Sequence, residues 1–209
     1  MNDAFAHLVG PVLQFMIEFP RRLARGEDPP LDEVRGELLA LLVEAEQRAP
    51  RELAGDFALA KYALIYWIDE VLINSGWSRA LDWREHILEW DFYRERLGGE
   101  AFFDRAREAE ALSRTDPLEV FFLCVALGFQ GKYTFSRPDL RKWAERAYGR
   151  IASGSKHPDR FLPEEPRDEV PTPLRPLPGK SILLAVCVLV SVTTLVTLAC
   201  FILAVHLTA

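Results

Sequence analysis

The chain has 209 residues, with 25 Lys and Arg against 31 Asp and Glu, and a formal net charge of −6. An acidic protein is poorly suited to nonspecific nucleic-acid binding or to strong adhesion on anionic lipid. The three cysteines argue against a disulfide framework, because Cys187 and Cys200 lie in an uncharged C-terminal run and Cys124 in an apolar stretch. Such cysteine usage fits a reducing compartment.

The N-terminal part of the sequence predicts two helices. Asn2 or Asp3 is placed to cap the first, whose apolar residues recur at helical spacing. Pro11 should kink this helix and Pro20 should weaken its end. The second helix starts after the segment 28–30, Asp-Pro-Pro, and carries a single apolar stripe.

A third predicted helix, from about Glu52 to Ser75, is the most apolar segment before the C-terminal run, and Gly76 fits its C-terminal cap. A helix that is apolar nearly all round is typical of a central helix. Asp69 falls on one of its apolar stripes, where a carboxylate must be paired or hydrogen-bonded. We weigh three roles for it: a structural network, a groove for a partner, and catalysis.

The remaining part before residue 153 also predicts helices, and no stretch alternates with a period of two, so we expect an all-α domain. The apolar helix that starts at Asp116-Pro117 should break at Gly128 and Gly131. The other predicted helices are Ala80–Leu97, Glu100–Ser113 and Leu140–Ile151.

The sequence divides into residues 1–152, a helical domain, a linker at 153–180, a membrane helix at 181–205 and a short tail at 206–209. The linker holds seven of the 14 prolines and is expected to form a semi-rigid stalk. The 181–205 run has no charged residue and is long enough to span a bilayer.

Basic residues are distributed unevenly around the predicted membrane helix. Arg167, Arg175 and Lys180 precede it, and no Lys or Arg follows it in the sequence. The positive-inside rule therefore predicts a single-pass, tail-anchored protein with its N-terminus in the cytoplasm.

Catalytic motifs are scarce. The segment 128–132, Gly-Phe-Gln-Gly-Lys, is too short for a phosphate-binding loop and is followed by Tyr133 in place of Ser or Thr. One acidic and histidine cluster has helical spacing, but a second matching pair that would complete a metal site is missing, so a solvated helix face is the favoured interpretation. This cluster consists of Asp82, Glu85, His86 and Glu89. We expect no catalytic residue, no metal and no cofactor.

Several motifs, in order, resemble one family. The segment 62–77, YALIYWIDEVLINSGW, resembles the aliphatic-Asp-Glu-x-x-Leu-x-x-x-x-Trp signature of the TssL/DotU family. The likeness continues through 98–103 (GGEAFF), 117–119 (PLE), 127–133 (LGFQGKY) and 138–142 (PDLRK), and ends in the C-terminal membrane helix.

This resemblance implies an inner-membrane component of a type VI secretion system, with relatives in type IVb systems. It implies a cytoplasmic, hook-like helical domain made of two small bundles. The implied partners are a large TssM/IcmF-like membrane protein and baseplate proteins on the cytoplasmic side, and we also expect self-association through the membrane helix. The residues carried over as partner-binding or structural are Asp69, Glu70, Trp77, Gln130, Lys132 and Tyr133.

Within the pair of acidic residues we expect different roles. Asp69 should belong to an internal network whose expected partner is the Gly128–Tyr133 turn, and Glu70 should be more available to partners. The sequence departs from the family pattern at Glu89, Trp90 and Asp91. It also stops four residues after Val205, so we expect no wall-binding domain beyond the membrane helix.

Two other classes of protein share parts of this pattern. A tail-anchored regulator of the Bcl-2 type has the same architecture, but the 74–79 segment, NSGWSR, has the letters of that class's Asn-Trp-Gly-Arg turn in the wrong order. A membrane-tethered, metal-dependent enzyme would need the cluster around His86, or Asp69, to bind metal or substrate.

Overall fold

The structure, a computed structural model, describes residues 1–154, and these are all-helical, with no strand among them. The predicted all-α class is confirmed for this part of the chain. None of the helices between residues 1 and 154 has the length and apolar character needed to cross a membrane. The α-helices are α1 (Asp3–Ala24), α2 (Leu31–Arg48), α3 (Ala54–Ile73), α4 (Ala80–Glu85), α5 (Leu88–Tyr93), α6 (Gly99–Ala111), α7 (Asp116–Ala126) and α8 (Arg137–Gly154), with short 3-10 turns η1 (Arg51–Leu53) and η2 (Gly131–Tyr133).

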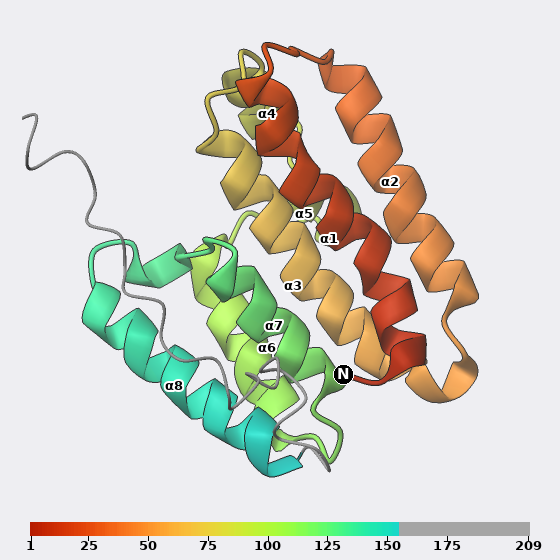
Figure 1. Ribbon diagram of the computed structural model, residues 1–209, viewed down its shortest axis with the longest axis vertical. Coiled ribbons are helices and arrows are strands. Elements are labelled where there is room, and N and C mark those ends of the chain that lie inside the picture. The colour runs from red at the N-terminus through yellow and green to blue at the C-terminus, as the bar shows by residue number, and fades with distance from the viewer. Residues whose placement is uncertain (155–209) are drawn as a thin grey trace, which may run out of the picture. The chain divides into compact units, whose positions relative to one another are not determined.

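Helix α3 is the central element (Figure 1). It packs against α1 and α2, against α4 and α5, and against α6 and α7. Burial on several sides explains why its sequence has no polar face. The helix is preceded by η1 and ends before Gly76, with Asn74 at its C-terminal cap. The predicted cap at Gly76 is therefore wrong, because the Asn74 side chain donates to the Glu70 carbonyl at 2.9 Å and closes the last turn.

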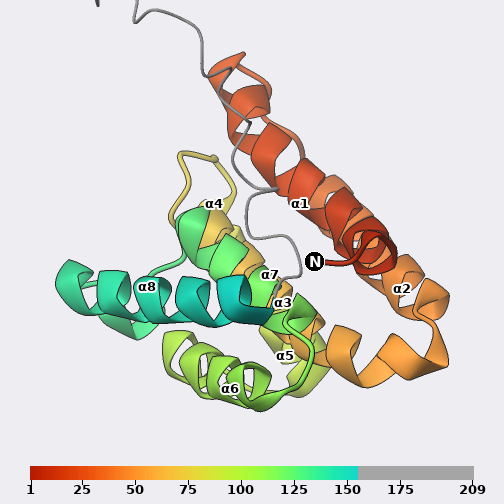
Figure 2. The ribbon, with the colours of Figure 1, turned by 60° about the horizontal axis from the view of Figure 1, so that its bottom comes forward.

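The other long helices lie on two sides of α3 (Figure 2). Helices α1 and α2 pack against each other on one side. On the other side α7 packs against α6 and α8. Each group buries an apolar stripe at helical spacing, such as Val34, Leu38 and Leu42 in α2.

Helix α1 begins as its sequence predicts and continues beyond Pro20. The Asn2 side chain accepts a hydrogen bond from the Phe5 amide at 2.8 Å, which satisfies one free N–H of the first turn. The helix then continues through Pro11 and Pro20 to Ala24. Pro20 therefore lies inside the helix and does not end it, and the buried Met16 and Phe19 hold this turn against the core.

The predicted helix Ala80–Leu97 is two short helices. Helix α4 ends at Glu85 and α5 starts at Leu88. The backbone amides of Leu88 and Glu89, which a continuous helix would direct to the preceding turn, donate instead to the side chain of Asp69 on α3. A tertiary contact, invisible in the local pattern, therefore breaks this segment.

The last described helix, α8, begins at Arg137 and extends to Gly154, beyond the domain boundary expected at residue 152. Its buried side chains are Trp143, Ala147 and Ile151. The predicted stalk from residue 155 onward, the membrane helix at 181–205 and the tail at 206–209 lie outside the described residues.

Candidate functional site: a cleft beside Glu70

Asp69 lies inside the domain, where it positions a neighbouring segment. Its side chain is 5% exposed and accepts three hydrogen bonds. The donors are the Trp83 indole N–H (2.8 Å), the Leu88 amide (3.0 Å) and the Glu89 amide (2.9 Å). Burial raises the pKa of Asp69 to about 6, while these donors favour the charged form and oppose the shift. The carboxylate thus fixes α4 and α5 on α3.

Glu70 makes the contact that the sequence predicts for Asp69. Its two carboxylate oxygens accept the backbone amides of Gln130 (2.7 Å) and Gly131 (2.9 Å). The expected bond between Asp69 and the Gly128–Tyr133 turn is therefore wrong, because Glu70 makes it. Glu70 is still the more accessible of the two, half-exposed where Asp69 is buried. Adjacent helix residues point about 100° apart, so the two carboxylates tie two different segments to α3.

The turn that Glu70 holds is also fixed by aromatic packing. Phe129 is buried, and its ring centroid lies 3.9 Å from that of Phe102 on α6. Gly128 and Gly131 have φ angles of +111° and +50°, which glycine adopts without the strain that a side chain imposes. The backbone at Gln130 and Gly131 is thus set in a defined position next to α3.

A cleft of about 730 Å³ lies where three segments meet. The C-terminal end of α1 contributes Leu23 and Ala24, and the C-terminal end of α3 contributes Glu70 and Asn74. The third wall is the turn after α7, which includes Gln130. Glu70 therefore lines the cleft and fixes one of its walls at the same time.

Two large apolar residues adjacent in sequence to cleft-lining residues are exposed. Phe135, one residue after the cleft-lining Thr134, is fully exposed. Leu127, which precedes Gly128, is 38% exposed. Large apolar side chains that a folded domain leaves in water are typical of surfaces that bind other proteins.

The three other residues carried over from the family motifs divide between core and surface. Trp77 is buried, donates its indole N–H to the Pro29 carbonyl at 3.0 Å and packs edge-on against Phe19. It joins the end of α1 to the loop after α3, and its burial leaves no free face. Lys132 is exposed beside the half-buried Tyr133, and its ammonium lies 5.6 Å from that ring.

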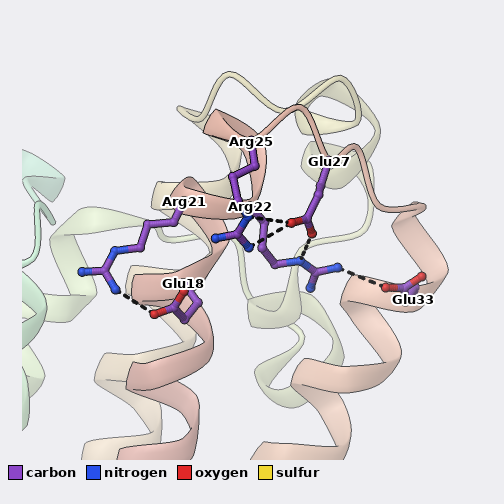
Figure 3. Close-up of polar contacts among 6 residues, drawn as sticks. All are labelled: Glu18, Arg21, Arg22, Arg25, Glu27 and Glu33. Carbon is purple, nitrogen blue, oxygen red and sulfur yellow. Dashed lines mark hydrogen bonds and ion pairs between the residues drawn. The ribbon is translucent and has the colours of Figure 1, made fainter.

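Ion pairs fix the end of α1 that borders the cleft (Figure 3). Arg22 bonds Glu27 at 3.0 Å and Glu33 of α2 at 3.3 Å. Arg25 pairs with the same Glu27, and the hydrogen bond from Arg22 is the largest cause that lowers the pKa of Glu27. Exposed pairs of this kind contribute little to stability, so their effect is mainly to orient the loop between α1 and α2.

The structure separates the predicted acidic and histidine cluster around His86. Glu89 is buried and accepts a hydrogen bond from the Tyr66 hydroxyl at 2.8 Å. The His86 ring nitrogen contacts the Asp82 carbonyl at 2.9 Å. Between residues 1 and 154, no group of three or more His, Cys, Asp or Glu side chains is arranged to hold a metal ion.

The α1 wall of the cleft could not be predicted from the sequence. Leu23 and Ala24 lie beyond Pro20, where the helix was expected to weaken, and nothing in their local sequence links them to α3.

The Gly98-Gly99 pair belongs to a family motif, and the Gly99 backbone packs directly on Gly131. A run of two glycines is the signal by which this close approach was recognisable.

The fold is similar to a known helical domain. The structure of the cytoplasmic domain of TssL from Acinetobacter baumannii matches with a TM-score of 0.61 and 26% sequence identity, covering 72% of this chain and 98% of that chain. No match is found among curated proteins. These features define an all-helical domain of the TssL cytoplasmic type.

The family follows from the sequence match. The family model described as type VI secretion system protein DotU matches residues 4–206. This chain therefore belongs to the DotU family of type VI secretion proteins, and the resemblance seen in its motifs is confirmed. The match runs through the helical domain and onward across the predicted linker and membrane helix.

Proposed function

We propose that this protein is a non-enzymatic, inner-membrane subunit of a type VI secretion complex, and that its helical domain docks cytoplasmic baseplate components. The observation that carries the proposal is the DotU family match over residues 4–206. That range includes the uncharged 181–205 run, which supports a membrane-anchored protein over a freely diffusing one.

The cleft beside Glu70 is the proposed docking site. Its walls come from three segments of the chain and are held by hydrogen bonds from the backbone of Gln130 and Gly131 to Glu70. A preformed site loses little conformational entropy when a partner binds. The exposed Phe135 next to the cleft supplies apolar area of the kind that anchors protein interfaces.

The membrane helix is proposed to act as more than a tether. It holds the helical domain with its N-terminus in the cytoplasm, associates with a TssM/IcmF-like membrane protein and contributes to self-association. Tethering raises the effective concentration of docked components near the complex without a need for high intrinsic affinity. The Pro-rich linker between them sets the reach of the domain.

The test is complementation of a strain that lacks this gene. The full chain should restore secretion of a type VI substrate into the medium, and residues 1–154 alone should still bind baseplate components in a pull-down but not restore secretion. Replacement of Ser181–Val205 by an unrelated membrane helix should insert correctly yet reduce secretion. Secretion supported by residues 1–154 alone would refute the proposed membrane-anchored mechanism.

A further inference from the structure

We propose a second docking surface on this domain, in addition to the cleft, that binds an acidic segment of a partner protein. It consists of Trp90 and its neighbours Arg94, Arg96 and Leu97, at the end of α5 and in the loop that leads to α6, and is named the Trp90 surface. Trp90 is 43% exposed and Leu97 is 60% exposed. Trp90 belongs to the 89–91 stretch that departs from the family pattern.

Two of the three carboxylates in residues 89–97 are hydrogen-bonded to α3. Glu89 accepts a hydrogen bond from the Tyr66 hydroxyl of α3 at 2.8 Å. Glu95 accepts one from the Tyr62 hydroxyl, also on α3, at 3.3 Å. The negative charges of Glu89 and Glu95 are therefore directed toward α3, although the sequence of this segment is rich in acidic residues.

The third carboxylate, Asp91, forms an ion pair with Arg35 of α2. The two arginines of the segment have no such partner among residues 1–154, and both are exposed. Their guanidinium carbons lie 5.7 Å (Arg94) and 5.8 Å (Arg96) from the centre of the Trp90 ring. The face that meets solvent thus combines an indole with two unpaired cations.

The backbone at Arg94 is held in an unfavourable conformation at this place. Its φ angle is +56°, and among residues 1–154 no other residue except glycine has a positive φ. A side chain disfavours this region, so glycine or asparagine is the usual residue at such a helix end. Here the conformation accompanies a guanidinium placed beside Trp90.

The charge of the surface selects an acidic partner. Guanidinium groups bind carboxylates through paired, charge-assisted hydrogen bonds, and Trp and Arg are the residues most enriched at the energetic centres of protein interfaces. A membrane surface is a poorer fit, because lipid-binding clusters contain about four to eight basic residues and this one has two.

The experiment uses the full chain in discs of zwitterionic lipid and a fluorescent peptide of glutamates and glycines around one leucine. The matched probe replaces every glutamate by glutamine. Binding is measured by anisotropy for the wild type, for Arg94→Gln with Arg96→Gln, and for Trp90→Leu. Arg141→Gln, on the exposed side of α8, is the control variant. Thermal melts verify that each variant is folded.

The glutamate peptide should bind the wild type and Arg141→Gln at least about tenfold more tightly than the glutamine peptide does, as expected for paired charge-assisted contacts. Both Trp90-surface variants should lose at least about tenfold in affinity, and added salt should weaken binding. Equal binding of the two peptides, or unchanged binding by both folded variants, would overturn the proposal. The proposal would also be overturned if the glutamate peptide does not bind at all, while anionic vesicles bind the wild type and not the double variant. That result would assign the surface to lipid.

Discussion

Gly99 and Gly131 lie backbone against backbone, so that a Cβ atom placed on Gly99 would sit 2.1 Å from the Gly131 Cα. This contact joins the start of α6 to the turn held by Glu70. It gives the turn a second point of attachment besides α3, and it depends on both residues having no side chain.

Gly99→Ala should therefore destabilise the domain by about 2–3 kcal/mol, because the clash is with backbone atoms that cannot rotate away. Gly149→Ala is the matched control, since Gly149 lies inside α8 and a Cβ atom there would meet no atom within 4 Å apart from its own helix backbone. That change should stabilise by up to about 1 kcal/mol, the helix-propensity difference. Urea unfolding followed by circular dichroism measures both, and equal effects would argue against the close contact.

The two neighbouring carboxylates on α3 predict unequal losses of stability. Asp69→Ala leaves three buried donors without an acceptor and should cost about 3 kcal/mol or more, while Glu70→Ala frees two half-buried backbone amides and should cost about 1–2 kcal/mol. Glu37→Ala, on the exposed face of α2, should be nearly neutral. Denaturant melts of the three variants test this order, and a smaller loss for Asp69→Ala than for Glu70→Ala would reverse the assignment.

The raised pKa of Asp69 predicts a specific pH dependence. Its value of about 6 in the folded protein lies above the ordinary value near 4, so the folded state binds the extra proton. The resulting stabilisation is complete below about pH 4 and is lost as the pH rises through 6. Relative to Asp69→Asn, which does not titrate, the wild type should lose on the order of 2–3 kcal/mol between about pH 4 and 7. A difference that stays constant over this range would contradict the shift.

The local sequence was sufficient to predict the starts and ends of elements that are set by residues at the same place in the chain. The cap at Asn2, the start of α7 at Asp116-Pro117 and the break after it at Gly128 each follow from the residues at that place. The position of Asp69 on an apolar stripe also indicated a buried network before any partner was known.

Elements that depend on distant contacts were not predictable in this way. The break between α4 and α5 is caused by hydrogen bonds to Asp69, which precedes Leu88 by 19 residues. Which segment Asp69 and Glu70 each bind depends on where α4, α5 and the turn after α7 pack around α3. Helical periodicity shows that adjacent residues point apart, but not which segment each of them meets.

Membrane topology is a further prediction, based on the basic residues before the 181–205 run. A reporter that is active only in the periplasm should stay silent when fused at Met1 and should be active when fused after Ala209. The same two fusions with a cytoplasmic reporter should give the opposite pattern. An active periplasmic reporter at Met1 would show that the orientation is reversed.

The most direct measurement of the central claim is secretion by a chain whose cleft is filled. Asn74 lines the cleft and is exposed, so Asn74→Trp should occupy the space; it removes the exposed hydrogen bond to the Glu70 carbonyl but no buried contact. Glu37→Trp adds the same ring on the exposed face of α2 and serves as the control. With both variants folded and in the membrane at wild-type levels, Asn74→Trp should abolish co-purification of baseplate components and secretion, and Glu37→Trp should retain both. Wild-type secretion by Asn74→Trp would contradict the claim that this cleft docks the baseplate.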